Sequence, residues 1–508
     1  MRERISFVQK LGDSLEPSAL TVNDGVIRGP EVDAAREDRL TIAVNELPSE
    51  LRTLVTGAQD LHIRWVSTAA YETVSPLLAR LPPGFHLFFT PGRNHAVTKG
   101  LCSILGNIFG DISCTTPDES FTVVGEERFQ YFQELNSLSH FIQYAKGQLC
   151  GATDASCSAR LDTLSTAGTL DMSYDIGERV LRVTALWPYQ RQKVHATSRP
   201  NTRTEVGILS TDKPKTLEAH EIGISGLLTV LGQDSKPSPT MFSFGSRHRD
   251  AESAFSARFL TPTGLHPTLQ LRLTSDGPPP SSSSDDEDAT TTTCTPYAYL
   301  TLPRTIFADK YQLSDPLFLA SKNLTALRHT TQPVDLEAPE YVMTQWGSSV
   351  LLELSPPASQ ERVGGKGTGE WTASIPLHLR YVAPAPGGYS TIAVPYPAVF
   401  WACEPAQGAV FPPNPFEKHH LGYDALFGGD TVFWHVAPKP AAAQGGLLVN
   451  EVRVPVLDVD RAGWVNAGTA AAVLVGFAWV VWKIVGVWAR GGKGGGVEGV
   501  REREKKRQ

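Results

Sequence analysis

The chain has 508 residues, of which 41% are hydrophobic and 19% charged, and its formal net charge at pH 7 is −7. This is the composition of a folded protein with room for two or three domains, and it excludes general disorder. Because the last residues are strongly basic, the chain before them is more acidic than the total indicates. An acidic body does not suit nucleic acid, whose phosphates need a basic surface, so we expect no nucleic-acid partner.

Residues 1–200 form the first predicted region, which is N-terminal and β-rich. Residues 1–60 are polar, and we expect short strands and loops there with little chemistry. The stretch 126–146 fits either a helix or another strand, because its periodicity does not decide between them. No apolar core is present in the first 20 residues, so a cleavable signal peptide is not expected. Apolar clusters with strand spacing occur at 61–66, 85–90, 121–124 and 181–187.

A second β-rich region is predicted at 201–274. Leu269, Leu271 and Leu273 alternate with polar residues, the period-2 pattern of a half-buried strand. The next stretch, 275–293, reads SDGPPPSSSSDDEDATTTT and is too polar to bury anything. We expect a disordered acidic Ser/Pro/Thr linker, and its carboxylates lack the glycine and spacing of a calcium loop.

The third predicted region is a β domain at 294–460. Ile375, Leu377 and Leu379 alternate with polar residues, and Val452 and Val454 do so shortly before the C-terminal apolar segment. Short strands separated by Pro/Gly turns indicate antiparallel sheets. The predicted fold class is therefore mainly β, with one or more antiparallel sandwich-like domains and one C-terminal transmembrane helix.

Six cysteines form an even set, which fits disulfides in an oxidising compartment. Local pairs are the expectation among about 15 connectivities, and free buried thiols are the alternative. The expected pairs are Cys102 with Cys114, Cys150 with Cys157, and Cys294 with Cys403. Asn323, followed by Leu324 and Thr325, is a glycosylation sequon that would be modified if it lies in the lumen of the endoplasmic reticulum (ER).

The segment 462–489 predicts one membrane-spanning helix. It begins with 21 residues that carry no charge, about the length needed to cross a hydrocarbon core. Trp464 and Trp482 lie about 27 Å apart along such a helix and would anchor it at the two interfaces. Gly468, Ala472 and Gly476 recur every four residues, which predicts a face for docking another helix; simple Gly/Ala richness is the alternative.

The tail, 490–508, carries seven basic and three acidic residues. Positive charge stays on the cytosolic side, so the tail is expected in the cytosol and the body in the ER lumen. Lys505 and Lys506 occupy the positions of a dilysine ER-retrieval signal. A basic tail that binds anionic lipid is the alternative.

Few residues suggest catalysis. Asp458 and Asp460 have the DxD spacing with which glycosyltransferases hold a metal, but the pattern is short and adjoins the membrane segment. His419, His420 and His435 match no metal-ligand spacing and are expected in loops. We therefore expect no cofactor, no metal site and no catalytic residue.

The chain resembles the fungal Pbn proteins, the counterparts of mammalian PIG-X. The similarity covers most of the chain outside the linker and tail and includes no catalytic motif. Segments that carry it are MRERISFVQK (1–10), AREDRL (35–40), LHIRWVS (61–67), DPLFLASKNLTALR (315–328), QPVDLEAPEYV (332–342), WGSSVLLELSPP (346–357), IPLHLRY (375–381), VPYPAVFWAC (394–403) and the C-terminal span.

This resemblance implies a single-span ER membrane glycoprotein that works in the biosynthesis of glycosylphosphatidylinositol (GPI) anchors. It would be the non-catalytic subunit of GPI-mannosyltransferase I, which adds the first mannose, and would stabilise a polytopic PIG-M-type catalytic subunit. It would also support the folding of some other ER proteins. The alternatives are a general ER membrane chaperone or adaptor, and an independent lumenal glycosyltransferase that uses Asp458 and Asp460.

Overall fold

The computed structural model describes residues 1–92, 95–124, 128–150, 154–212, 217, 220–274, 293–331, 335–356, 370–404, 411–418, 421–441 and 444–491, with backbone only for 95–99 and 491. Nearly all of the predicted linker and tail, with Lys505 and Lys506, therefore lies outside the described residues, as do His419 and His420. The chain forms two compact units, Met1–Tyr381 with Thr391–Val452, and Val382–Ser390 with Arg453–Gln508.

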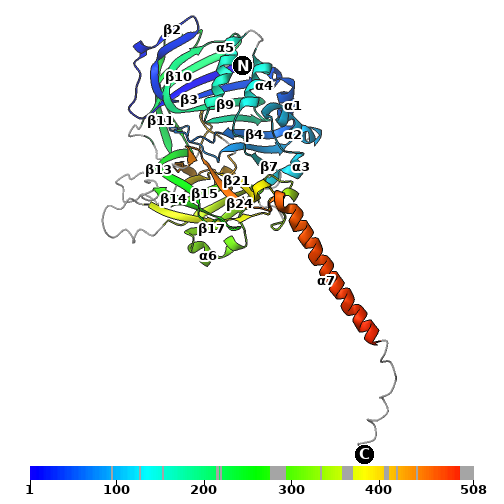
Figure 1. Ribbon diagram of the computed structural model, residues 1–508. Coiled ribbons are helices and arrows are strands. Elements are labelled where there is room, and N and C mark those ends of the chain that lie inside the picture. The colour runs from blue at the N-terminus through cyan, green and yellow to red at the C-terminus, as the bar shows by residue number, and fades with distance from the viewer. Residues whose placement is uncertain are drawn as a thin grey trace, which may run out of the picture. The chain divides into compact units, whose positions relative to one another are not determined.

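A twelve-stranded sheet forms much of the first unit (Figure 1). The spatial order is β12-β11-β10-β1-β3-β9-β8-β4-β5-β7-β6, with β2 paired to β3. Its pairs are antiparallel except β1 and β10, which run parallel. The strands are β1 (Arg2–Gln9), β2 (Thr21–Asn23), β3 (Val26–Ala43), β4 (Ala58–Val66), β5 (Gly84–Pro91), β6 (Thr122–Val124), β7 (Arg128–Gln133), β8 (Thr169–Asp175), β9 (Val180–Thr197), β10 (Arg203–Asp212), β11 (Glu221–Val230) and β12 (Ser238–Gly245).

Helices pack on this sheet through apolar stripes. α1 buries Leu51, Leu54 and Val55, and α4 buries Phe141 and Ile142, in one cluster with the sheet. This spacing is that of a helix with one buried face. The helices of this part are α1 (Ser49–Thr56), α2 (His95–Phe109), α3 (Pro117–Ser120), α4 (Ser139–Leu149) and α5 (Ala155–Asp162), with 3-10 turns η1 (Pro17–Ala19), η2 (Val44–Glu46) and η3 (Thr163–Thr166).

An eight-stranded sheet completes the first unit, in the order β17-β18-β15-β22-β23-β13-β14-β19. Only β13 and β23 run parallel among its pairs. The strands are β13 (His248–Phe259), β14 (Thr268–Thr274), β15 (Thr293–Pro303), β17 (Leu324–Thr330), β18 (Gly347–Leu354), β19 (Glu370–Pro376), β22 (Ala398–Glu404) and β23 (Val432–Pro438). Smaller elements are β16 (Ile306–Phe307) paired with β20 (His378–Leu379), α6 (Pro316–Ala320), η4 (Gln312–Ser314), η5 (Glu340–Val342) and η8 (Asp424–Leu426).

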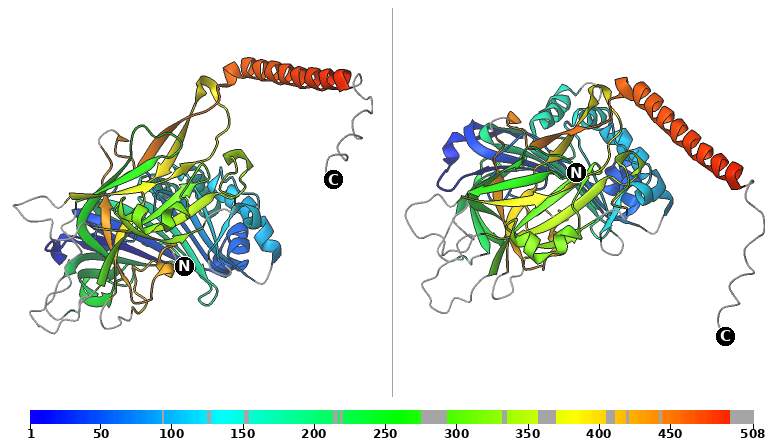
Figure 2. Two further views of the ribbon diagram at one scale, coloured as in Figure 1. Left: turned by 90° about the horizontal axis from the view of Figure 1, so that it is seen from below. Right: turned by 60° about the horizontal axis from the view of Figure 1, so that its bottom comes forward.

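An aromatic cluster joins the two sheets. Phe88 on β5, Tyr299 on β15 and Phe400 on β22 lie in one buried cluster with Tyr423. The rings of Phe400 and Tyr423 lie 4.6 Å apart between centroids. A shared core of this kind is typical of sandwiched sheets and confirms the mainly β fold class. Both sheets are visible in the views of Figure 2.

The strands of each sheet do not follow the boundaries of the predicted regions. Strands β10–β12, placed in a second region beginning at residue 201, belong to the first sheet. Strands β13 and β14, also placed there, belong to the second sheet. The cause is long-range pairing: Arg2 aligns with Arg203 in the parallel pair β1–β10, a contact with no local sequence signal.

Two local expectations are also settled. The stretch 126–146 contains both of the elements considered, strand β7 followed by most of helix α4. The expectation of short strands in residues 1–60 is wrong, because β3 extends over 18 residues. This strand also buries the carboxylate of Glu37.

Three disulfides join the described cysteines. The bonds are Cys102–Cys114, Cys150–Cys157 and Cys294–Cys403, the same partners that local pairing suggests. Cys294 and Cys403 face each other across β15 and β22. The three bonds suit an oxidising compartment.

The second unit contains a long helix and the segments at its start. Helix α7 (Ala462–Gly491) follows the turn η10 (Val459–Arg461). η7 (Pro386–Gly388) and part of the two-stranded sheet β21 (Tyr389–Pro395) with β24 (Val449–Pro455) belong to this unit, and the sheet continues into the first unit.

Candidate functional site

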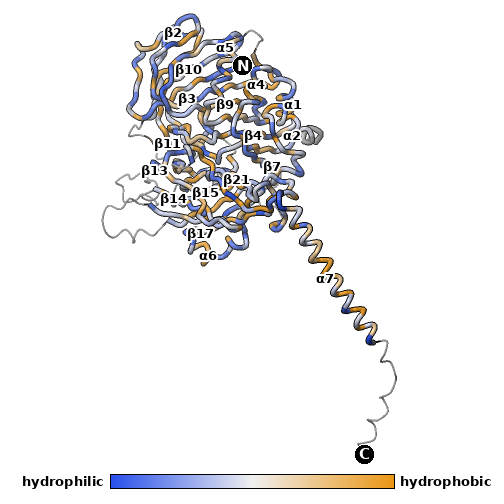
Figure 3. Tube along the Cα trace, in the orientation of Figure 1, coloured by the Kyte–Doolittle hydropathy of each residue, from blue (hydrophilic) through white to orange (hydrophobic). Residues whose placement is uncertain are grey.

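Helix α7 is the most distinctive feature of the second unit. It has 30 residues, and Val459–Arg490 is long and apolar enough to cross a membrane. None of its most apolar 18-residue stretch is buried by the described chain. Figure 3 shows apolar residues along most of its length. A helix that is apolar on all sides and uncovered by protein is suited to a lipid environment.

The predicted interface anchors and docking face all lie on exposed helix. Trp464 is 84% exposed and Trp482 69%. The Lys483 ammonium lies 5.6 Å from the centroid of the Trp482 ring, so both can reach one interface. A methyl group built on Gly468 or Gly476 would meet no atom within 4 Å, so this side has room for another helix.

Two segments distant in the chain, 382–390 and 453–461, pair with each other at the start of α7. The backbone N–H of Val456 donates to the carbonyl of Gly388 (3.0 Å), and that of Ala385 donates to Leu457 (3.1 Å). Gly387 and Gly388 have φ of 77° and 73°, which favours glycine at both positions of this turn. The turn therefore fixes the segment that leads into the helix.

Asp458 has a structural partner at each oxygen. Its Oδ1 accepts from the backbone N–H of Asp460 (3.1 Å), which caps η10, and its Oδ2 lies 3.5 Å from Nε of Arg461. Among the residues that the structure describes, no group of three His, Cys, Asp or Glu could hold a metal ion. The described geometry therefore gives Asp458 the role of a helix cap.

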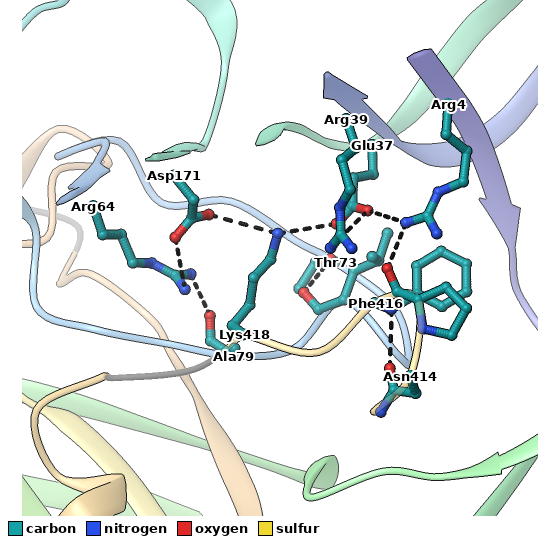
Figure 4. A network of polar contacts seen from close by, with 12 residues as sticks. Arg4, Glu37, Arg39, Arg64, Thr73, Ala79, Asp171, Asn414, Phe416 and Lys418 are labelled. Carbon is teal, nitrogen blue, oxygen red and sulfur yellow. Dashed lines mark hydrogen bonds and ion pairs between the residues drawn. The ribbon is translucent and has the colours of Figure 1, made fainter. Parts of the chain in front are cut away.

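A buried charge network lies on one face of the large sheet (Figure 4). Its two carboxylates, Glu37 on β3 and Asp171 on β8, have side chains 0% and 4% exposed. Lys418 Nζ lies between them, 3.1 Å from Glu37 Oε2 and 3.7 Å from Asp171 Oδ2. The network consists of Arg4, Glu37, Arg39, Arg64, Asp171 and Lys418, with His62 bonded to Asp171.

Surrounding cations keep both carboxylates ionised. Burial alone would raise the pKa of Glu37, but Lys418, Arg39 and Arg4 outweigh burial and lower it to about 2. The pKa of Asp171 is likewise lowered, because Arg64 and Lys418 outweigh its burial. Burial lowers the pKa of Lys418, and the two carboxylates oppose this shift.

The segment 414–418 attaches the C-terminal half of the first unit to the large sheet. Arg4 Nη2 donates to the carbonyl of Pro415 (2.6 Å), and its guanidinium lies 4.7 Å from the Phe416 ring centroid. Asn414 Nδ2 donates to the carbonyl of Gly245 (3.0 Å). Lys418 then inserts between the two carboxylates, so residues nearly 400 positions apart share one polar core.

This network was not predicted from the sequence. A signal was available in AREDRL (35–40), because strand alternation places Glu37 and Arg39 on one face and Arg36 and Asp38 on the other. The actual partners, Lys418 and Asp171, come from distant positions and could not be identified from local pattern.

Two other predicted residues have defined positions. Asn323 is exposed, and its Nδ2 donates to the carbonyl of Thr372 (2.8 Å). The expectation that His435 lies in a loop is wrong: it is 1% exposed on β23, and its Nε2 lies 3.0 Å from Nδ1 of His248. Burial lowers the pKa of His435 well below its usual value.

The fold and α7 together define a mainly β protein with one C-terminal helix able to span a membrane. The family described as PIG-X / PBN1 matches residues 262–485, from the second sheet into α7. "Protein pbn1" of Neurospora crassa is 59% identical over 500 residues, covering 97% of this chain and 96% of that protein. "Protein PBN1" of Gibberella zeae is 46% identical, covering 96% of each, and that of Yarrowia lipolytica is 28% identical, covering 94% and 92%.

The chain belongs to the PIG-X / PBN1 family. Membership supports a role in GPI-anchor biosynthesis, and the long apolar helix at the C-terminal end of the described chain fits an ER membrane protein.

Proposed function

We propose that this protein is a non-catalytic subunit of GPI-mannosyltransferase I, in which it stabilises a polytopic catalytic subunit of the PIG-M type. The observation that carries the proposal is helix α7 in a chain of this family, whose most apolar stretch is not buried and which carries Gly468, Ala472 and Gly476 four residues apart. A helix with such a row of small residues can approach another helix closely in lipid. The reaction chemistry would belong to the partner.

The body would lie in the ER lumen and the tail in the cytosol. Three disulfides in the body and the basic residues after Ala489 both support this orientation. Asn323 would then be available for glycosylation, and Lys505 and Lys506 for retrieval to the ER. A wider role in stabilising a subset of ER proteins would use the same lumenal body.

Purification of the full chain from detergent, with identification of the bound membrane proteins, tests the proposal. We expect one polytopic mannosyltransferase in stoichiometric amount, and we expect its cellular level to fall when this chain is depleted. If the purified chain transferred mannose alone, the assigned roles would be wrong. Recovery of many unrelated clients with no mannosyltransferase would instead indicate a general chaperone.

A further inference from the structure

A large cavity opens in the first unit where β13 and β23 part. Its volume is about 1130 Å³. The parallel pairing aligns His248–Asp250 with Phe433–His435 and resumes only at Ala254 opposite Ala437. The additional residues form a β-bulge, and within it Glu252 has a φ of 50°, which is uncommon for a residue with a side chain. Bulges and strained backbone of this kind concentrate at binding sites.

Four residues that line this cavity have buried polar atoms without hydrogen-bond partners. Arg80 is only 8% exposed. Burying a polar atom without a hydrogen-bond partner costs free energy. The presence of several such atoms in residues around one cavity therefore calls for a specific cause. No partner exists among the residues that the structure describes for Arg80 Nε, Arg249 Nε and Nη2, Ser253 Oγ and His435 Nδ1, and all four residues line the cavity.

Aromatic rings hold both guanidinium groups in place. Arg80 lies 5.3 Å from the centroid of Tyr71, and Arg249 lies 5.5 Å from that of Trp434. Contact with a ring occupies the face of a guanidinium and leaves its N–H edge available. That edge matches a carboxylate or a phosphate, with two parallel hydrogen bonds to two oxygens.

The carboxylates of the cavity limit which anion can enter. Glu72 is already paired with Lys10 at 2.6 Å, and Asp250 Oδ1 accepts from the backbone of Glu252 at 3.0 Å. Burial lowers the pKa of Arg249 to about 10, with Glu221 opposing the shift, so this arginine remains charged at pH 7. The other charged residues that line the cavity are Asp212, Glu221, Glu252, Lys10 and Lys439. A polyanion would be repelled, whereas one oxyanion group on a neutral body would not.

We infer that this cavity binds a small molecule through a single oxyanion group, a phosphate or a carboxylate, held by Arg80 and Arg249 and assisted by Ser253 and His435. The inference does not depend on the proposed subunit role, because every residue involved lies in the β body. The inference assigns a ligand site to the β body, a part of the chain whose role is not explained by the proposed docking of helix α7.

Calorimetric titration of the full chain in uncharged detergent, with inorganic phosphate and separately with acetate, tests the site. We expect saturable binding of at least one anion, and at least tenfold weaker binding in the double variant Arg80→Gln/Arg249→Gln. Binding of phosphate alone identifies a phosphate ligand, and binding of acetate alone a carboxylate ligand. Arg258→Gln is the matched control, because Arg258 is exposed on the same strand β13. The affinity of this variant for the anion should equal that of the wild type.

A second variant covers the case in which the double variant fails to fold. Arg80→Lys/Arg249→Lys keeps both charges but loses the planar N–H edges, so binding should weaken while the fold persists. Absence of saturable binding by the wild type, or equal binding by all variants, would overturn the inference.

Discussion

Glu37 illustrates how a single buried carboxylate can link the N- and C-terminal parts of the body. Its oxygens contact Arg4 and Lys418, and Arg39 is 3.6 Å away. Loss of one member of a buried charged pair is strongly destabilising, because the remaining charges stay desolvated without compensation. The pKa of Glu37 is lowered to about 2 by the same interactions with Lys418, Arg39 and Arg4.

The coupling predicts an acid-dependent loss of stability. A carboxylate whose folded-state pKa lies below its unfolded value stabilises the fold fully above the unfolded value, about 4.3. Its contribution disappears as the pH falls towards the folded value of about 2. We therefore expect Glu37→Gln to lower the free energy of unfolding by roughly 3 kcal/mol at pH 7 and by progressively less below about pH 4.

Urea denaturation of the full chain in detergent, followed by tryptophan fluorescence at several pH values, measures this difference. Glu31→Gln is a suitable control, since Glu31 forms an exposed ion pair with Arg191 (3.1 Å), and its loss should matter little at any pH. A Glu37→Gln difference that stays constant from pH 7 to pH 3 would contradict the assigned pKa.

At the scale of elements, strands were predictable where their alternation is local. Leu269, Leu271 and Leu273 alternate with polar residues and form β14, because one face of that strand is buried. The apolar run from Ala462 to Trp482 lies within α7. The bulge in β13 was not predictable, because Asp250–Ala254 departs from regular pairing only in relation to β23.

Helix α7 gives the element-scale prediction. A Cβ added at Gly468 or Gly476 meets no atom within 4 Å apart from the neighbouring residues and the helix's own backbone, so leucine at both positions would fill the small-residue face. We expect unchanged thermal stability of the body and a several-fold loss of the membrane partner in detergent co-purification, because large side chains separate the helix backbones.

Ala470→Leu provides the control for this face. At 100° per residue, position 470 points away from positions 468 and 476, so an added leucine there should leave co-purification unchanged. Equal recovery of the partner with all variants would exclude the small-residue face from the interface. The paired segments 382–390 and 453–461, or the β body, would then supply the interface.

At the scale of the whole molecule, the predicted class and the C-terminal apolar helix agree with the structure, and strands of the predicted region 201–274 are shared between the two sheets. The predicted boundaries followed composition, but sheets are assembled by pairing. Lys418 and Glu37 are 381 residues apart and still form one ion pair. The cavity has the same origin, since Arg80, Arg249 and His435 come together only through the fold.

The orientation of the whole chain can be tested at Asn323, which is exposed at the end of a turn. If the body is lumenal, the protein should carry a glycan there, and Thr325→Ala should abolish the mobility shift produced by endoglycosidase. Thr325 is exposed, so this variant removes the sequon without disturbing the bond from Asn323 to Thr372. Thr325→Ser keeps the sequon and should keep the shift.

Protease added to sealed microsomes tests the same orientation. It should remove only the basic tail, because the membrane protects the disulfide-bonded body. Digestion of the body would place the body in the cytosol and would refute the orientation on which the proposed subunit role depends.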